Sequence, residues 1–127
     1  MIIRAAGLTG ALLLVGAASA AFASDPPFLG NWARGDGKTR IRVERCGDEV
    51  CALNTWVRSG VSGEKIGDRL TLNIAPAGAA GWSGNAFDPQ RNQTYTMVLH
   101  IANNRMATDG CAMGGLLCRS MSWTRLN

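Results

Sequence analysis

Beyond about residue 28, short runs of alternating apolar and polar residues dominate the chain, and this two-residue period most constrains its fold. The clearest run covers residues 69–74, where Leu70, Leu72 and Ile74 occupy every second position. Successive side chains of a β-strand point to opposite faces, so each run predicts a strand with one buried face. No long stretch shows the 3.6-residue period of a helix. The predicted strands are eight: 29–34, 39–46, 51–57, 69–74, 82–87, 93–101, 105–111 and 119–126.

Eight short antiparallel strands predict an all-β domain, and specifically a small eight-stranded up-and-down barrel. Closing a sheet on itself removes the exposed edges through which strands pair with other chains. A two-sheet β-sandwich is the alternative. Gly47-Asp48 and Asn103-Asn104 predict tight hairpin turns, because glycine and asparagine tolerate positive φ. The loosest loops are expected at 59–67 and 78–81.

The first 23 residues have the pattern of a secretion signal. A basic start ending at Arg4 precedes an apolar run over 5–20 and the small-x-small sequence Ala21-Phe22-Ala23, which predicts cleavage before Ser24. An uncleaved membrane anchor is the alternative, because the run approaches the ~20 residues that span a bilayer. Cleavage would leave 104 residues with a net charge of +3, enough for a single domain over 24–127. We therefore expect a periplasmic or secreted protein.

Four cysteines support an oxidising destination: Cys46, Cys51, Cys111 and Cys118. An even number in a small exported domain predicts two disulfides. The short spacings favour the local pairs Cys46–Cys51 and Cys111–Cys118, the first across the Gly47-Asp48 turn. A long-range pairing such as Cys46–Cys118 is the alternative, because closing a longer loop stabilises more. The C-x6-C spacing is less typical of a zinc site than of a disulfide.

An ordered set of short motifs runs from about Phe28 to Arg125. It comprises Gly30-Asn31-Trp32, Cys46-Gly47-x-x-x-Cys51, Trp82-Ser83-Gly84, Phe87-Asp88-Pro89, Thr94-Tyr95, Gly110-Cys111, Leu117-Cys118 and Trp123-Thr124-Arg125. The set resembles a small exported bacterial family, domain of unknown function 2147. The resemblance implies a lipocalin-like fold, in agreement with the eight predicted strands. In lipocalins an arginine near the end of the barrel packs over the G-x-W tryptophan, so it also implies a cation–π contact between Trp32 and Arg125 or Arg119.

The sequence shows no recognisable set of catalytic residues. The one histidine, His100, falls on the polar face of its run, and neither a second histidine nor a G-x-S-x-G motif is present. The carboxylates are scattered over predicted turns, and no phosphate-binding glycine motif occurs. We therefore predict a non-catalytic protein with no cofactor and no metal. A small hydrolase is the remaining alternative.

Three arginines cluster on one predicted hairpin: Arg40, Arg42 and Arg45. Such residues are usually a solvated strand face, and export argues against a nucleic-acid partner. Acidic lipid headgroups or envelope polysaccharide are the alternative contacts, and the attraction would weaken in salt. Peripheral membrane contact is thus compatible with the sequence.

Ligand binding is the function that the predicted fold favours, because an eight-stranded barrel can hold one small ligand. The candidate ligand-binding residues are Trp32, Trp56, Tyr95, Met97, Trp123 and Arg125. With only about 13 residues for each strand and its loop, we nevertheless expect bulky side chains to fill most of the lumen. These inward residues are Ile41, Val43, Leu70, Leu72, Tyr95, Met97, Leu99, Met121 and Trp123.

The predicted function is that of a monomeric binding or interaction module of the bacterial envelope, with a small apolar molecule as ligand. The alternative is a structural module with a filled barrel. It would present the loops 78–82 and 113–117 to an envelope protein, because Met113, Leu116 and Leu117 are apolar residues in a predicted loop.

Overall fold

The computed structural model describes residues 7, 10–11, 25–79 and 81–127. The predicted signal peptide over 1–23 lies almost wholly outside the described residues, as does the predicted cleavage site before Ser24. Among the residues that are described, no helix is both long enough and apolar enough to cross a membrane.

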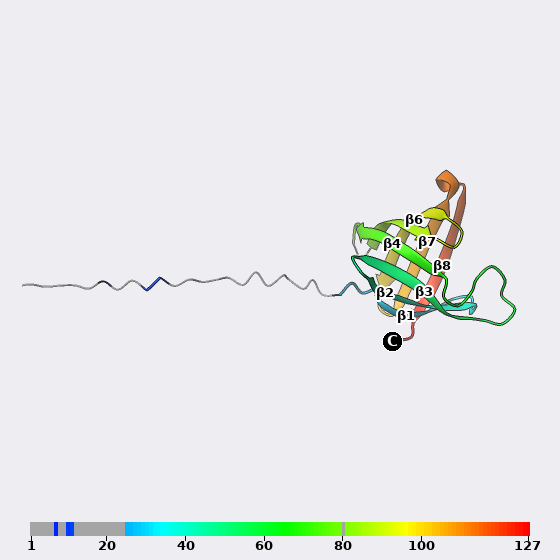
Figure 1. The fold of residues 1–127 in the computed structure, drawn as a ribbon, viewed down its shortest axis with the longest axis horizontal. Coiled ribbons are helices and arrows are strands. Elements are labelled where there is room, and N and C mark those ends of the chain that lie inside the picture. Colours follow the sequence, from blue (N-terminus) through cyan, green and yellow to red (C-terminus); the bar gives the residue numbers. More distant parts are fainter. Residues whose placement is uncertain (1–6, 8–9, 12–24, 80) are drawn as a thin grey trace, which may run out of the picture.

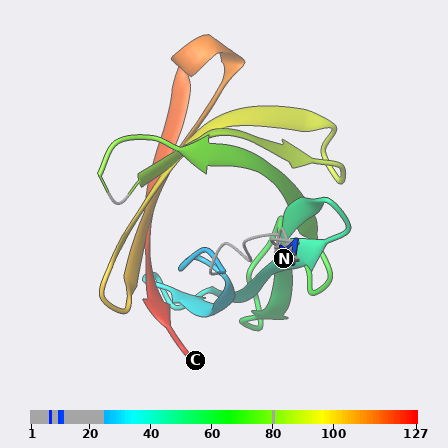
Figure 2. The same cartoon turned by 90° about the vertical axis from the view of Figure 1, so that its left-hand side faces the viewer.

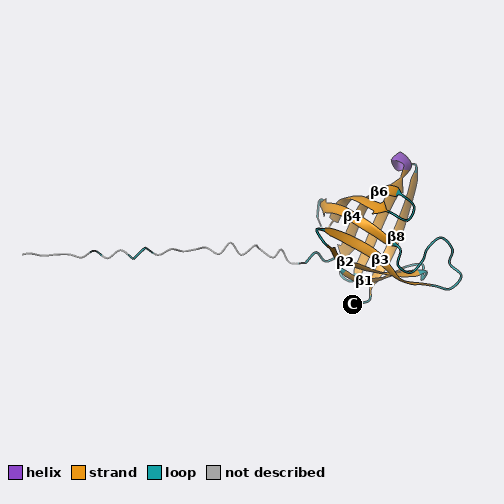
Figure 3. Ribbon diagram, in the orientation of Figure 1, coloured by secondary structure: helices purple, strands orange, loops and turns teal. Residues whose placement is uncertain are grey.

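Eight antiparallel strands form a closed barrel, and Figure 2 shows the ring that they make. Each strand pairs with the next along the chain, and β1 pairs with β8, so that Trp32 lies opposite Arg125 and Arg34 opposite Trp123. This closure confirms the predicted all-β barrel and excludes the two-sheet sandwich. The strands, seen in Figures 1 and 3, are β1 (Gly30–Arg34), β2 (Thr39–Cys46), β3 (Glu49–Val57), β4 (Arg69–Pro76), β5 (Gly81–Asp88), β6 (Gln93–Ala102), β7 (Arg105–Ala112) and β8 (Leu117–Arg125).

The predicted turns and cysteine pairs determine where several strands end. Gly47 adopts a φ of +69° and Asn103 a φ of +58°, and each opens a two-residue hairpin turn. Both local disulfides are present, which confirms the favoured pairing. β3 and β8 each begin two residues earlier than predicted. β3 begins at Glu49 because Glu49 already pairs with Cys46 across the Gly47-Asp48 turn. β8 begins at Leu117 because Leu117 pairs with Ala112, next to the pair of Cys111 with Cys118.

One end of the barrel is closed around Trp32, which is fully buried. Its Nε1 donates a 3.0 Å hydrogen bond to the carbonyl of Phe28, whose ring meets the Trp82 ring edge-on with centroids 5.2 Å apart. The guanidinium of Arg125 lies 4.3 Å from the centre of the Trp32 ring and donates to the carbonyls of Leu29 and Pro27. The expected cation–π contact is therefore present, and Arg125 makes it.

Candidate functional site

A cavity of about 730 Å³ occupies the barrel and opens at the end away from Trp32. Its wall includes Ile41, Leu72, Leu99 and Met121, and its mouth is bordered by the β3–β4 loop at Ser62–Glu64 and by the β5–β6 turn. Eight of the nine predicted inward residues do belong to the hydrophobic core or pack against it, as expected. They leave a cavity, however, so the expectation that they fill most of the lumen is wrong.

Small residues on the inward face make the room. Ala52, Ala86, Gly110 and Ala112 all line the cavity, each at the same alternating parity as its bulky neighbours. The inward residues that predicted a filled lumen are only the large ones. Volume depends on every inward position, including those with little or no side chain.

Three of the six candidate ligand-binding residues line the cavity: Tyr95, Met97 and Trp123. Tyr95 and Met97 lie on the inward face of β6, and Trp123 lies on β8. These two strands flank β7 in the barrel, one on each side. Trp123 Nε1 donates a 3.0 Å hydrogen bond to Thr108 Oγ1, and the Tyr95 hydroxyl lies 3.3 Å from Gln93 Oε1. The polar atoms of both rings are thus engaged with neighbouring side chains, while both residues line the cavity.

The other three candidates do not line the cavity. Trp32 and Arg125 belong to the closed end, where they pack on each other. Trp56 points to the outer face of β3, is 37% exposed, and has the Arg40 guanidinium 4.8 Å from its ring centre. The register between β2 and β3 shifts between Arg40 and Ile41. Because of this irregularity, Trp56 lies opposite Arg40, on the outside of the sheet. We therefore leave these three out of the candidate site.

The mouth of the cavity is built on a buried arginine. Arg34, at the end of β1, is only 8% exposed. Its Nη1 and Nη2 donate to the two oxygens of Glu64 at 2.7 and 2.9 Å, and its Nε donates to Asp36 at 2.9 Å. The hydrogen bonds that Arg34 donates to Glu64 and Asp36 hold the pKa of its guanidinium above the ordinary range, although burial lowers it. The same contact with Arg34 lowers the pKa of Asp36.

A second ion pair, between Asp88 and Arg91, borders the mouth of the cavity. Burial raises the pKa of Asp88, but hydrogen bonds from Arg91 at 2.8 Å and from Gln90 at 2.7 Å outweigh it, so that the pKa is lowered overall. Arg91 also donates to the carbonyl of Gly63 and lies 3.9 Å from Asp68. The β3–β4 loop is thus fastened to the barrel by Arg34 at one point and by Arg91 at another.

Sequence reasoning missed the seven charged residues that line the cavity: Arg34, Glu64, Asp68, Arg69, Asp88, Arg91 and Arg119. The alternation could have found three of them, since Arg34, Asp88 and Arg119 share the inward parity of Trp32, Ala86 and Met121. Glu64 and Arg91 lie on loops, where no periodicity shows direction.

Within the described part of the chain, no three histidine, cysteine or acidic side chains lie close enough to hold a metal ion. His100 is exposed on the outer face of β6, away from the carboxylates at the mouth. The arrangement suits non-covalent binding, with an apolar wall to accept a hydrophobic body and charged groups where that body would meet water.

The fold and the cavity define a small, open, eight-stranded β-barrel that fits the lipocalin-like description. The family model described as "Uncharacterized protein conserved in bacteria (DUF2147)" matches residues 30–125, and the chain belongs to this family. A solved structure of a redesigned beta barrel is similar, with a TM-score of 0.52 and 12% sequence identity over 78% of this chain and 91% of that chain. At that identity the likeness concerns the fold alone. No curated protein matches the chain.

Proposed function

We propose that this protein is a non-catalytic binding module that holds one small apolar molecule in its barrel. The observation that carries the proposal is the open cavity of about 730 Å³ with a largely apolar wall. Ligand sites for small molecules have volumes of about 300–1,000 Å³ and are lined mainly by hydrophobic and aromatic side chains. Burial of an apolar ligand there would contribute roughly 25 cal/mol for each Å² removed from water.

An exported, envelope-associated role fits the same features. Both disulfides are of the kind that persist in oxidising compartments, and the family is bacterial. A binding module in the periplasm or outside the cell would meet lipids and other apolar envelope molecules. The alternative of a filled, purely structural barrel is less favoured, because the lumen is not filled.

The test uses N-phenyl-1-naphthylamine, an uncharged probe whose fluorescence rises in apolar surroundings. We expect saturable binding at one site per barrel. Gly110→Phe should abolish it, because an added Cβ at Gly110 meets nothing closer than the Thr96 carbonyl at 3.8 Å and the larger ring would enter the cavity. Envelope lipids can then be ranked by displacement of the probe.

Ala107→Phe is the matched control, because Ala107 is exposed on the outer face of the same strand. It adds the same ring without entering the cavity, and probe binding should be retained. Equal binding by the two variants, or no binding by the unmodified protein, would refute the proposal.

A further inference from the structure

Two loops at the open end of the barrel carry the most exposed large hydrophobic side chains of the described residues. Ile66 on the β3–β4 loop is 67% exposed, and Met113, Leu116 and Leu117 at the β7–β8 turn are 63%, 81% and 61% exposed. No other large hydrophobic residue in the described part of the chain exceeds 49%. In Figure 1 the β3–β4 loop (green) and the β7–β8 turn (orange) project beyond the strands.

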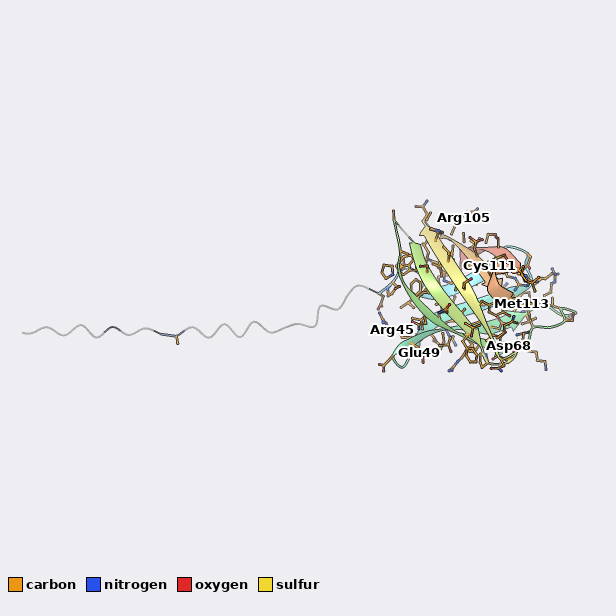
Figure 4. The ribbon with its side chains drawn as sticks, turned by 90° about the horizontal axis from the view of Figure 1, so that it is seen from above. Arg45, Glu49, Asp68, Arg105, Cys111 and Met113 are labelled. Atoms are coloured by element: carbon orange, nitrogen blue, oxygen red, sulfur yellow. A yellow bond between two sulfur atoms is a disulfide. The ribbon has the colours of Figure 1, made fainter. Side chains whose placement is uncertain are left out.

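Both loops are held in place. The Cys111–Cys118 disulfide joins β7 and β8 directly beneath the turn, which contains the short 3₁₀ element η1 (Met113–Gly115), whose residues all have positive φ. Arg34 and Arg91 fasten the β3–β4 loop through Glu64 and Gly63. Leu117 and Cys118 line the cavity on one side and Ser62–Glu64 on the other, so the exposed apolar residues flank its mouth. Met113 and Asp68 lie at one side of the molecule in Figure 4, and Arg45 and Glu49 at the other.

The positive charge of the barrel is concentrated at this same end. We define the open end as the connections 35–38, 58–68, 89–92 and 113–116 together with the charged strand residues that line the cavity. It carries seven cationic and four anionic side chains, whereas the rest of residues 25–127 carries five of each. The net charge of +3 therefore comes entirely from the open end.

The four carboxylates of the open end are already engaged. Asp36 and Glu64 pair with Arg34, and Asp88 and Asp68 pair with Arg91. Five exposed cations of the open end make no ion pair with any other described residue: Lys38, Arg58, Lys65, Arg69 and Arg119. These cations are available to an external anionic surface.

We propose that the open end docks on an anionic lipid bilayer, with Met113, Leu116, Leu117 and Ile66 entering the interface and the surrounding cations facing lipid phosphates. Exposed apolar patches mark interaction sites, and a combination of apolar insertion with basic residues is the chemistry of interfacial membrane binding. A polyanion such as a nucleic acid would use the cations but gives the aliphatic tips no apolar partner. Docking in this orientation places the cavity mouth against the membrane.

The experiment is vesicle co-sedimentation of protein expressed from the full chain, so that all variants share one N-terminus. Binding should favour phosphatidylglycerol-containing vesicles over pure phosphatidylcholine and weaken as salt is raised. Leu116→Ser should weaken it roughly tenfold, as expected for losing one leucine from an apolar environment. Lys65→Gln should weaken binding to the anionic vesicles selectively.

Leu126→Ser and Arg105→Gln are the matched controls, since Leu126 is 49% exposed and Arg105 is exposed, both at the closed end. They should bind as the unmodified protein does. The proposal would be overturned if the closed-end variants lost as much vesicle binding as the open-end variants, or if Leu116→Ser left vesicle binding unchanged. Equal affinity of the protein for a DNA fragment and for anionic vesicles would also overturn it. Gly110→Phe, which should lose the apolar probe, should keep vesicle binding, so failure of docking and failure of ligand binding can be told apart.

Discussion

The side chain of Arg125 joins the last strand of the barrel, β8, to the first, β1. It stacks on Trp32 of β1, binds the carbonyls of Leu29 and Pro27, and occupies space where a Cβ on Gly30 would lie 2.9 Å from its Nη1. Glycine at position 30 of the G-x-W motif therefore serves the close approach of the Arg125 guanidinium, and this contact links the G-x-W motif to the closing W-x-R in this chain.

Replacing Arg125 should destabilise the closed end in steps. Arg125→Ala should lower the free energy of unfolding by about 2–3 kcal/mol, from a lost cation–π contact and unpaired carbonyls. Arg125→Lys should cost about 1–2 kcal/mol, because lysine keeps the charge but not the planar fork. Urea unfolding measures both, with Arg105→Ala as an exposed control. Full stability of the lysine variant would contradict this account.

Thr39 offers a stabilising substitution. The residue is only 1% exposed, and its buried hydroxyl makes no hydrogen bond within the described structure. Thr39→Val replaces the hydroxyl with a methyl group of similar shape and should raise the free energy of unfolding by about 1 kcal/mol. Thermal unfolding followed by circular dichroism tests this, with the exposed Thr94→Val as control. A loss of stability would show that the hydroxyl has a partner.

At the scale of elements, the β2–β3 and β7–β8 hairpins are each held by a disulfide. The two bridges close short loops, with sequence separations of 5 and 7. The chain-entropy model then gives each about 2 kcal/mol, less than a long-range bridge would give. The pairing follows from hairpin geometry rather than from maximal stabilisation.

Removing either bridge should therefore be tolerated. We expect Cys46→Ser with Cys51→Ser, and Cys111→Ser with Cys118→Ser, each to lower the free energy of unfolding by about 2 kcal/mol. Cys46→Ser alone should cost about 2–5 kcal/mol, the range seen for native bridges in small secreted domains. Chemical denaturation of each variant beside the unmodified protein checks these values, and thermal unfolding of reduced and oxidised unmodified protein tests the two bridges together. Identical melting temperatures in the two redox states would contradict them.

The β3–β4 loop should respond to acid. Asp36 and Asp88 have lowered pKa values in the folded state, so their stabilisation is present above the ordinary carboxyl pKa of about 3.9 and is lost as pH falls through the lower folded value. Arg34 has a raised pKa, so its contribution is lost only in strong alkali. The melting temperature should be constant between about pH 5 and 8 and fall below about pH 4.

Asp88→Asn tests this prediction directly. It should lower the free energy of unfolding at pH 7 by roughly 1.5–3 kcal/mol, the contribution of a hydrogen bond to a charged group, and flatten the decline in acid. Melting curves across the pH range measure both effects. An unchanged acid slope in the variant would argue against a role for this ion pair.

At the scale of the whole molecule, the seam between β1 and β8 makes the barrel a single cooperative unit. Its residues lie at opposite ends of the described domain, so closure requires every intervening hairpin. We expect two-state unfolding, with the far-ultraviolet circular dichroism transition coinciding with tryptophan fluorescence from β1, β3, β5 and β8. Two separate transitions would show that part of the sheet melts alone. Folding should also be slow for the size of the domain, because the closing contacts are far apart in sequence.

The sequence by itself determined the number and approximate bounds of the strands and the hairpin turns, and it favoured the local cysteine pairs, because these features depend on neighbouring residues. Alternation along β4 and β6 marks the buried face, and Gly47 and Asn103 supply the positive φ that their turns need. The strand count favoured a closed barrel, because closure removes exposed edges, but it left the two-sheet sandwich open until the pairing of β1 with β8 excluded it.

The tertiary structure alone decided whether the barrel is filled and what lies at its mouth. Lumen volume is a sum over inward side chains from all eight strands, and Gly110 and Ala86 count in it as much as Leu99 does. The ion pairs of Arg34 with Glu64 and of Arg91 with Asp68 join residues on different elements. Alternation shows which way a strand residue points, but the contacts of a side chain depend on the barrel that all strands build together.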